Sequence, residues 1–291
     1  MSNSDPVVRI ATRSSPQART QAEAVAAAIV NAHPGTRAEL VLVETLGDQQ
    51  ADVALHTIGG QGVFVKEVQY AVLAGQADIA VHSAKDLPSM QAPGLVIAAF
   101  SARRDPRDAL IGSTLDGLAL GATVATGSVR RRAQLRALRP DLRFVELRGN
   151  IHTRLAKVPV NGAIVMAVAA LEVLGITEHI SQSMDIDVMV PAVGQGCVAI
   201  ECRHDDTITA QILAALDHQQ TRRQVTAERA FLAELGTGCS LPLGAHAANG
   251  MLCGFLANDA HRCVQISVEL GRDWIATART TAAQLQATLL S

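Results

Sequence analysis

Aromatic side chains are the scarcest feature of this 291-residue sequence, which contains five Phe, one Tyr and one Trp. Proteins that bind single-stranded nucleic acid stack bases on such rings, and this chain has almost none to offer. The composition therefore argues against a nucleic-acid-binding protein, although part of the chain is rich in arginine. We expect no nucleic-acid partner.

Paired cysteines and long apolar runs are missing as well. The five Cys form no C-x-x-C pair and their number is odd, which argues against a disulfide framework, and no Cys/His spacing indicates a metal site. The longest apolar stretch, around residues 162–175, is broken by glycine and is shorter than the roughly 20 residues that a membrane span needs. Because the N-terminus also lacks a signal-peptide pattern, we expect a soluble cytoplasmic protein without a membrane or metal partner.

Positive charge, by contrast, is concentrated in residues 126–157. This segment holds nine of the 25 Lys and Arg residues against two acids, Asp141 and Glu146, and so carries about +7. The whole chain has a formal net charge of −2, so the remainder sums to about −9. Such a concentration predicts a local anion-binding site rather than a uniformly basic surface.

Strand and helix patterns alternate over most of the chain. Early elements are a strand at 7–12, a helix that begins at Ser15-Pro16 and a strand at 37–43. Strands at 122–126, 143–147 and 162–166 are followed by helices at 129–139, 150–157 and 167–174. This alternation predicts parallel sheets covered by helices, an α/β fold. The tail differs: two or three strands between 244 and 270 and a closing helix from about Thr281 indicate an α+β unit.

Two breaks divide the chain into domains. The polar segment at 101–108 and the Gly/Pro-rich segment at 191–196 each interrupt the pattern, and we interpret them as crossings between domains. Domain 1 is then discontinuous and comprises residues 1–96 and 197–218. Domain 2 comprises residues 97–196, and domain 3 comprises residues 219–291.

Three strand-to-helix turns share one design, in the segments ATRSSP, ATGSVRR and LRGNIHTR. Each offers a Ser or Asn cap and places an arginine beside it: Arg13, then Arg130 and Arg131, then Arg148 and Arg154. Free N–H groups at a helix start and adjacent guanidinium groups both favour anions. Ligands of open α/β sheets bind at the carboxyl ends of the strands, so the three turns are candidates for one shared cleft. The alternative is a solvated helix face, which we expect for Arg132, Arg136 and Arg139.

Two other segments carry candidate reactive groups. Lys85 and Asp86 follow a buried strand and form either an exposed charged turn or a carboxylate among cations, which can stabilise a cationic intermediate or relay a proton. Cys239 lies in a Gly-flanked turn where a thiol is accessible, whereas Cys197 and Cys202 lie in a strand and are expected in the core. Residues 46–61 form either a mobile loop over a cleft or a plain surface loop.

The motifs of this chain resemble those of the porphobilinogen deaminase family, also called hydroxymethylbilane synthases. The resemblance rests on strings that occur in order between residues 8 and 247, and the last 45 residues match poorly. These strings are RIATRSSPQA, GVFVKE, DIAVHSAKDLP, RDPRDA, GSVRRRAQL, RPDL, LRGNIHTRL, PAVGQG, IECR and AERAFLAELGTGCSLPLG.

This resemblance implies a three-domain transferase of tetrapyrrole (porphyrin and heme) biosynthesis, and we expect it to be a monomer. Its first two domains would be α/β domains like those of type II periplasmic binding proteins, followed by a small α+β C-terminal domain. The enzyme joins four porphobilinogen units head to tail on a dipyrromethane cofactor and releases the linear tetrapyrrole by hydrolysis. Cys239 matches the residue that holds the cofactor through a thioether. Asp86 matches the catalytic aspartate, which assists the loss of ammonia and stabilises the resulting azafulvenium cation.

The resemblance also assigns binding residues, and it identifies the anion as the acetate and propionate carboxylates of the pyrroles. Residues that match cofactor contacts are Ser83, Lys85, Thr126, Ser128, Arg130, Arg131, Arg148, Arg154 and Gln195. Residues that match substrate contacts are Arg13, Ser15 and Gln21, together with Arg148 and Arg154.

Four positions depart from the family pattern. Leu46, Thr57, Gln61 and Val173 stand where the family usually has basic residues, and fewer cations should weaken the binding of the later pyrrole units. Two alternatives therefore stay open. One is a divergent paralogue with an altered oligopyrrole length or pyrrole substrate. The other is a non-catalytic anion-binding protein on the same scaffold, although the presence of both Asp86 and Cys239 argues against it.

Overall fold

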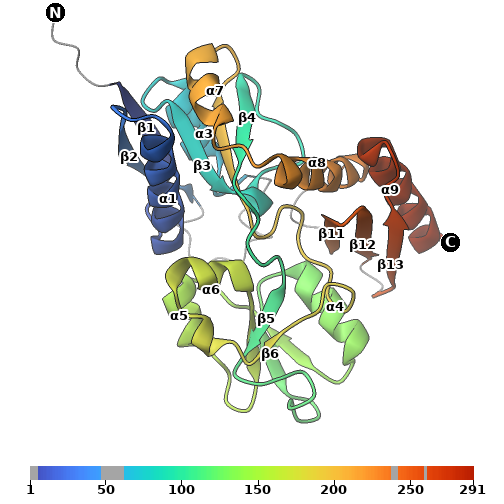
Figure 1. Cartoon of the computed structure of the whole chain (residues 1–291). Helices are drawn as coiled ribbons and strands as arrows, with labels where there is room; N and C mark the ends of the chain where they lie inside the picture. Colours follow the sequence, from blue (N-terminus) through green and yellow to red (C-terminus); the bar gives the residue numbers. More distant parts are fainter. Residues whose placement is uncertain (1–5, 47–61, 237–241, 259–260) are drawn as a thin grey trace, which may run out of the picture.

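The chain folds into two large α/β units and a smaller third unit (Figure 1). The structure is a computed structural model that describes residues 6–46, 62–236, 242–258 and 261–291. Within these residues each large unit contains a five-stranded sheet, and the third unit contains a three-stranded sheet. The fold class predicted from the sequence is confirmed. No helix in the described residues is both long enough and apolar enough to span a bilayer.

The first unit has the strand order β2-β1-β3-β10-β4. Helix α1 covers one face of this sheet, because its buried residues Ala22, Val25 and Ile29 repeat at helical spacing and pack against Ile10 and Ile79. The elements of this unit are β1 (Val7–Arg13), α1 (Pro16–Ala32), β2 (Arg37–Val43), α3 (Lys66–Leu73), β3 (Ile79–Ser83), η1 (Ala84–Asp86), β4 (Leu95–Phe100), β10 (Val198–Arg203) and α7 (Thr207–Ala214).

The second unit has the strand order β7-β6-β8-β5-β9. Its central strand β8 is buried along its whole length, as expected for a strand with neighbours on both sides and helices on its faces. The elements are β5 (Asp108–Ile111), β6 (Thr123–Ala125), α4 (Val129–Leu138), β7 (Arg143–Val145), α5 (Ile151–Leu155), β8 (Ala163–Ala167), α6 (Val168–Leu174), η2 (Thr177–His179) and β9 (Gln182–Ser183). Helix α6 contacts α1, so the two large units pack directly against each other.

Both large sheets are mixed, which corrects the prediction of purely parallel sheets. Strands β5 and β10 run antiparallel to their neighbours. Each is the first strand after a crossing, and its first residue pairs with the last residue of a neighbour: Asp108 with Ala167, and Val198 with Ser83. The crossing chain thus enters each sheet at the edge where the parallel strands end, and it must run in the opposite direction.

The two crossings lie side by side between the large units. The Arg104 N–H donates to the Gly196 carbonyl over 2.7 Å. Gly196 has a φ of +94°, and a Cβ there would lie 2.6 Å from the Arg104 carbonyl oxygen, so only glycine allows this approach. The boundary expected at 96/97 falls inside β4, which belongs to the first sheet, so we place the crossing after Phe100.

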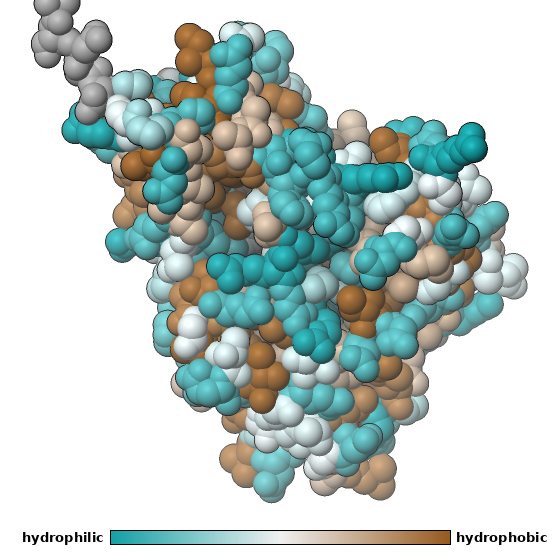
Figure 2. Space-filling model, in the orientation of Figure 1, coloured by the Kyte–Doolittle hydropathy of each residue, from teal (hydrophilic) through white to brown (hydrophobic). Residues whose placement is uncertain are grey.

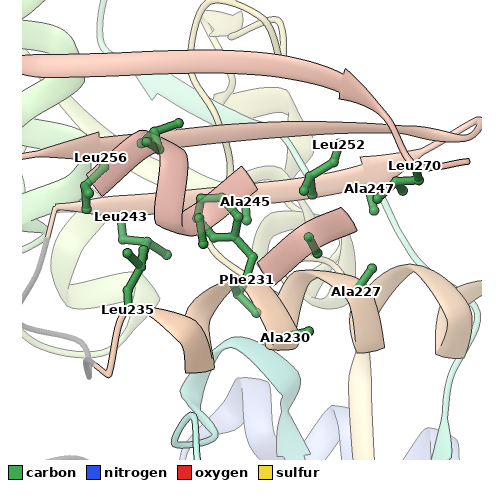
Figure 3. Packing of buried hydrophobic residues seen from close by; sticks show 14 of the residues in the cluster. Ala227, Ala230, Phe231, Leu235, Leu243, Ala245, Ala247, Leu252, Leu256 and Leu270 are labelled. Atoms are coloured by element: carbon green, nitrogen blue, oxygen red, sulfur yellow. The ribbon is translucent and has the colours of Figure 1, made fainter. Parts of the chain in front are cut away.

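The third unit packs two helices on one face of an antiparallel sheet. Figure 3 shows Phe231 of α8 pointing at this sheet, where the Phe231 ring occupies the space that a side chain at Gly254 would need. Its elements are α8 (Gln219–Glu234), β11 (Leu243–Ala248), β12 (Met251–Ala257), β13 (Cys263–Glu269) and α9 (Trp274–Leu290). Helix α9 begins at Trp274, not near Thr281 as predicted, because the Asp273 side chain caps it by accepting from the Ile275 and Ala276 N–H groups.

Candidate active site

The three strand-to-helix turns have the caps that the sequence predicts. Ser15 Oγ accepts from the Ala18 N–H at the start of α1, with Pro16 at the first helical position. Ser128 Oγ accepts from the Arg131 N–H at the start of α4, and Asn150 Oδ1 accepts from the Thr153 N–H at the start of α5. These hydroxyl and amide oxygens therefore fix the turns from which the candidate arginines project.

A cavity of about 390 Å³ lies between the two large units. Of the three turns expected in one cleft, two line it: Arg13 and Ser15 from the first unit, and Arg148 and Arg154 from the second. The turn that carries Arg130 and Arg131 does not line it. The remaining lining residues are Ser14, Pro16, Gln17, Phe64, Gly149, Asn150, Ile151, His152 and Leu174. Figure 2 shows hydrophilic residues gathered where the two large units meet on this face.

The arginines of this cavity are held in place by the protein. The Arg13 guanidinium lies 4.1 Å from the centre of the Phe64 ring, a cation–π contact. Arg154 Nε donates to the Gly149 carbonyl over 2.8 Å. Burial, and then the charges of Arg131 and Arg148, lower the pKa of Arg154 to about 10, which still leaves it charged at neutral pH. The cavity is therefore strongly cationic.

Lys85 and Asp86 lie on the short helix η1 that directly follows β3, and both side chains are half-buried. Burial and the charge of Arg131 lower the pKa of Lys85 to about 8, while Asp86 and Asp108 oppose this change. Asp86 also interacts with Arg154 from the second unit. The carboxylate of Asp86 is thus placed among cations from both large units, which favours the sharper of the two interpretations of this segment.

Ser83 and Gln21 contact each other instead of standing free. Ser83 Oγ donates to Gln21 Oε1 over 3.0 Å. Both residues line a second, small cavity of about 20 Å³ together with Lys85 and Cys197. Cys197 and Cys202 are buried, as predicted, and burial raises the pKa of Cys197 to about 12, so its thiol is not a nucleophile at neutral pH.

The predicted cofactor residues of the second unit form a buried network around a carboxylate. Arg130 and Arg131 are 5% and 8% exposed, and both pair with Asp108. Gln195 Nε2 donates to Asp108 Oδ1, and Gln195 Oε1 has no hydrogen-bond partner among the described residues. Thr126 Oγ1 accepts from the Ser128 N–H and is also buried.

Three residues of this region are not among those predicted from the sequence: Asp108, Phe64 and His152. Asp108 was readable as a lone acid that opens a buried strand immediately after an arginine-rich crossing. Phe64 was one of only five Phe in the chain, next to a lysine-bearing helix. His152 lines the cavity from the short helix α5, which Asn150 caps, and no sequence pattern predicted this position.

The remaining arginines of α4 and its C-cap residue Arg139 lie outside the candidate site, as expected, but they are not simply solvated. Arg132 pairs with Glu146, and Arg139 pairs with Asp141 at 2.8 Å. Arg136 contacts the His261 ring of the third unit at 2.9 Å. These side chains therefore brace α4 against its surroundings.

Only some of the remaining predicted residues lie in the described part of the structure. Val173 is half-buried on α6 and next to Leu174 of the cavity wall, and Leu46 is 40% exposed. Thr57, Gln61 and Cys239 lie outside the described residues.

The charges of this region suit a ligand with several carboxylates. Among the described residues of this region, six cations from the two large units stand against two carboxylates, those of Asp86 and Asp108. Backbone carbonyls hold Arg130, Arg131 and Arg154, and a net positive set of this size fits a polyanionic chain of pyrroles such as a dipyrromethane. The cationic residues are Arg13, Lys85, Arg130, Arg131, Arg148 and Arg154.

Comparison with known proteins gives two matching family models. The model described as "Porphobilinogen deaminase, dipyromethane cofactor binding domain" matches residues 8–211. The model described as "Porphobilinogen deaminase, C-terminal domain" matches residues 222–290, so the similarity extends beyond the motifs found in the sequence.

Curated relatives agree with these matches. Proteins named porphobilinogen deaminase from Roseiflexus sp. and Acidothermus cellulolyticus are each 49% identical to the chain, over 241 and 248 residues. These alignments cover 81% and 82% of this chain, and 80% and 74% of the relatives.

Among solved structures, similar ones include a TRAP periplasmic solute-binding protein from Desulfovibrio salexigens, with a TM-score of 0.43 and 13% identity over 75% of this chain and 74% of that chain. Another is the alkanesulfonate-binding protein from Xanthomonas axonopodis pv. citri, with a TM-score of 0.39 and 13% identity over 98% of this chain and 94% of that chain.

Proposed function

Because the chain belongs to the porphobilinogen deaminase family, we propose that it joins four porphobilinogen molecules head to tail and then releases the linear tetrapyrrole by hydrolysis. The observation that carries this proposal is the placement of Asp86 among cations of both large units, beside a cation-lined cavity. The reaction needs both features, since each pyrrole unit brings two carboxylates and the intermediate is a cation.

The family's dipyrromethane cofactor supplies a covalently attached primer to which pyrrole units are joined. We assign Lys85, Arg130 and Arg131 to its carboxylates, because they form the cationic group that is separate from the large cavity. Arg148 and Arg154 extend this group toward the substrate. Ser128 and Thr126 shape the turn, and Gln195 Oε1, which has no hydrogen-bond partner in the part of the chain that the structure describes, is a candidate acceptor for a pyrrole N–H. Cys239 would provide the thioether.

The incoming substrate is assigned to the large cavity. Arg13, Arg148 and Arg154 can each bind a carboxylate bidentately, and the 390 Å³ volume has the size of an ordinary small-molecule site. Ser15 contributes by fixing the turn that carries Arg13. Gln21 acts through its hydrogen bond to Ser83.

Asp86 has the central chemical role in this proposal. When ammonia leaves porphobilinogen, positive charge develops on the pyrrole, and a carboxylate fixed in advance stabilises that charge. The short helix η1 provides such fixation, because its backbone is held by the Leu87 N–H bond to the Ala84 carbonyl and the Ala84 N–H bond to the Cys197 carbonyl. The same carboxylate can accept a proton once the new bond has formed.

The intact mass of the purified protein and the mass of its released product test this function together. We expect a covalent dipyrrole on Cys239, ammonia release on addition of porphobilinogen, and a linear tetrapyrrole as product. The Cys239→Ser variant should carry no adduct. Absence of both ammonia release and covalent pyrrole in the unmodified protein would overturn the proposal, and a product of another length would identify the chain as a divergent member of the family.

We further propose that the enzyme works as a monomer in the cytoplasm. All residues assigned above come from one chain, and thiol chemistry at Cys239 suits a compartment that keeps cysteines reduced. Light scattering coupled to size-exclusion chromatography should give the mass of a single 30.5 kDa chain. A mass twice as large would contradict the monomer.

A further inference from the structure

Asp108 is a fully buried carboxylate at the point where three proposed cofactor residues meet. It is the first residue of β5 and is 0% exposed. Its Oδ2 atom lies 2.7 Å from Arg130 Nη2. Its Oδ1 atom accepts from Arg131 Nε at 3.0 Å, from Arg131 Nη2 at 2.7 Å and from Gln195 Nε2 at 3.0 Å.

These contacts keep two adjacent guanidinium groups charged inside the protein. Burial lowers the pKa of Arg130 and the neighbouring Arg131 lowers it further, whereas Asp108 raises it. The two arginines in turn hold the pKa of Asp108 near 2 against the effect of its burial. Without the carboxylate, two like charges would be buried side by side, which is strongly unfavourable. With it, the three groups have a net charge of +1.

The same contacts also fix the direction of both guanidinium groups. Arg130 Nη1 donates to the Val190 carbonyl at 2.6 Å, and Arg131 Nη1 donates to the Val165 carbonyl at 2.9 Å. Each group is therefore held by a carbonyl on one nitrogen and by Asp108 on another. An arginine ordered during folding does not lose its side-chain entropy again when a ligand binds.

This cluster faces the proposed cofactor site and not a remote part of the core. Lys85, which belongs to the first unit, lies close enough for Arg130, Arg131 and Asp108 all to affect its pKa. Gln195 lies on the return crossing between the units and joins the same carboxylate. The cluster therefore lies at the junction of the two large units.

We propose that Asp108 is a positioning residue for the cofactor: its carboxylate holds Arg130 and Arg131 so that their remaining N–H groups meet the cofactor carboxylates. This inference rests on the proposed function. Asp108 and the bound cofactor neutralise the same two arginines, so the effects of each on the stability of the protein are coupled. Loss of the Asp108 charge should therefore destabilise the cofactor-free protein more than the loaded protein.

Asp108→Asn tests this coupling, because asparagine keeps the shape and removes the charge. Anion-exchange chromatography separates cofactor-free from loaded molecules through the added carboxylates, and intact mass identifies each fraction. Thermal unfolding followed by circular dichroism then gives Tm for both. We expect the variant to lower the Tm of the cofactor-free form by about 8 °C and that of the loaded form by less than half as much. If the variant is recovered only in its loaded form, the cofactor-free form is too unstable to isolate, which also supports the inference.

Asp217→Asn is the matched control. The Asp217 side chain is only 6% exposed and is also ion-paired, with Arg222 at 2.5 Å, and its Oδ1 accepts from the Phe100 N–H at the end of β4, outside the proposed site. Its substitution should lower Tm equally in both forms. If Asp108→Asn behaves like this control, Asp108 is only a structural residue and the inference is wrong.

Asp108→Glu covers the case in which the asparagine variant does not fold. Glutamate keeps the charge but moves the carboxylate by one methylene, so it should remain folded while misplacing both guanidinium groups. We expect a cofactor-loaded fraction several-fold smaller than in the wild type, and an unchanged fraction would contradict the inference. A wild-type protein that never carries a dipyrrole would overturn the proposed function instead.

Discussion

Lys85 and Asp86 place opposite charges on adjacent residues of one short helical turn. In a region where six cations face two carboxylates, Asp86 is the carboxylate that borders the substrate side, since it interacts with Arg154 of the cavity. The surrounding cations keep polyanionic pyrroles bound, while the single carboxylate favours the transient cation. Binding and chemistry thus depend on charges of opposite sign at neighbouring residues.

Asp86→Asn separates these two roles. The amide keeps the size of the side chain but cannot stabilise a cation as a carboxylate does, so we expect kcat to fall about 10²- to 10³-fold. The mass of the loaded protein should stay unchanged, because the cofactor contacts remain. Asp116→Asn, at an exposed aspartate of the second unit, should retain full kcat. An unchanged kcat in Asp86→Asn would rule out the proposed role.

Lys85 predicts a pH dependence of the stabilisation that the bound cofactor gives to the protein. Its pKa is lowered to about 8, so the ammonium is charged below that pH and loses its charge as pH rises through it. Its contact with the cofactor carboxylates should therefore weaken above pH 8, and the Tm difference between the loaded and the cofactor-free protein should become smaller. Bound carboxylates stabilise the ammonium and shift this step to higher pH.

The comparison with Lys85→Arg isolates this step, because an arginine stays charged across the whole range. The variant should lack the part of this decrease that belongs to Lys85. The Tm of loaded and cofactor-free protein, measured from pH 7 to 10 for the wild type and the variant, provides the test. Parallel profiles in the two proteins would show that Lys85 does not titrate in this range.

At the scale of elements, helix caps connect folding to the site. Ser15, Ser128 and Asn150 each end the turn after a strand by accepting a backbone N–H of the following helix. Their side chains thereby fix where each helix starts and where the next arginine points. They therefore contribute to binding through the geometry of the turns.

Ser128→Ala removes the cap of α4 and should lower the free energy of unfolding by about 1 kcal/mol. The free N–H groups at the helix start then lose their side-chain acceptor. Urea denaturation measures the change. Ser128→Thr keeps a hydroxyl at this position and serves as the control, with an expected loss of less than half that of alanine. Equal losses in the two variants would show that the hydroxyl does not act as a cap.

At the scale of the whole molecule, Glu228 joins all three units. This fully buried carboxylate on α8 accepts from both terminal nitrogens of Arg103 on the first crossing, at 2.6 and 2.9 Å. It also accepts from the Gly194 N–H of the return crossing and the Ala247 N–H of β11. One side chain thus holds both crossings against the third unit.

Glu228→Gln should lower the free energy of unfolding by about 3–5 kcal/mol, because it leaves Arg103 buried without a counter-ion. Equilibrium urea unfolding gives this value. Glu146→Gln removes the partner of Arg132 at a half-exposed ion pair, where the loss should stay below about 1 kcal/mol. A similar small loss in Glu228→Gln would mean that water or another group compensates Arg103.

The sequence by itself determined the α/β class, the helix caps and the arginines near the cavity. Periodicity, cap residues and the order of motifs are local properties, so each can be read within a few positions of the chain. The same local information placed Arg13 and Arg148 at strand ends, and the structure brings both to one cavity.

Only the tertiary structure decided which charges pair across long separations. Asp108 joins Arg130, Arg131 and Gln195, up to 87 residues away, and no local pattern encodes that meeting. The antiparallel direction of β5 and β10 likewise depends on the edge at which the crossing chain enters each sheet. Electrostatic partners and strand directions are set by packing between distant segments, and for that reason the sequence alone left them open.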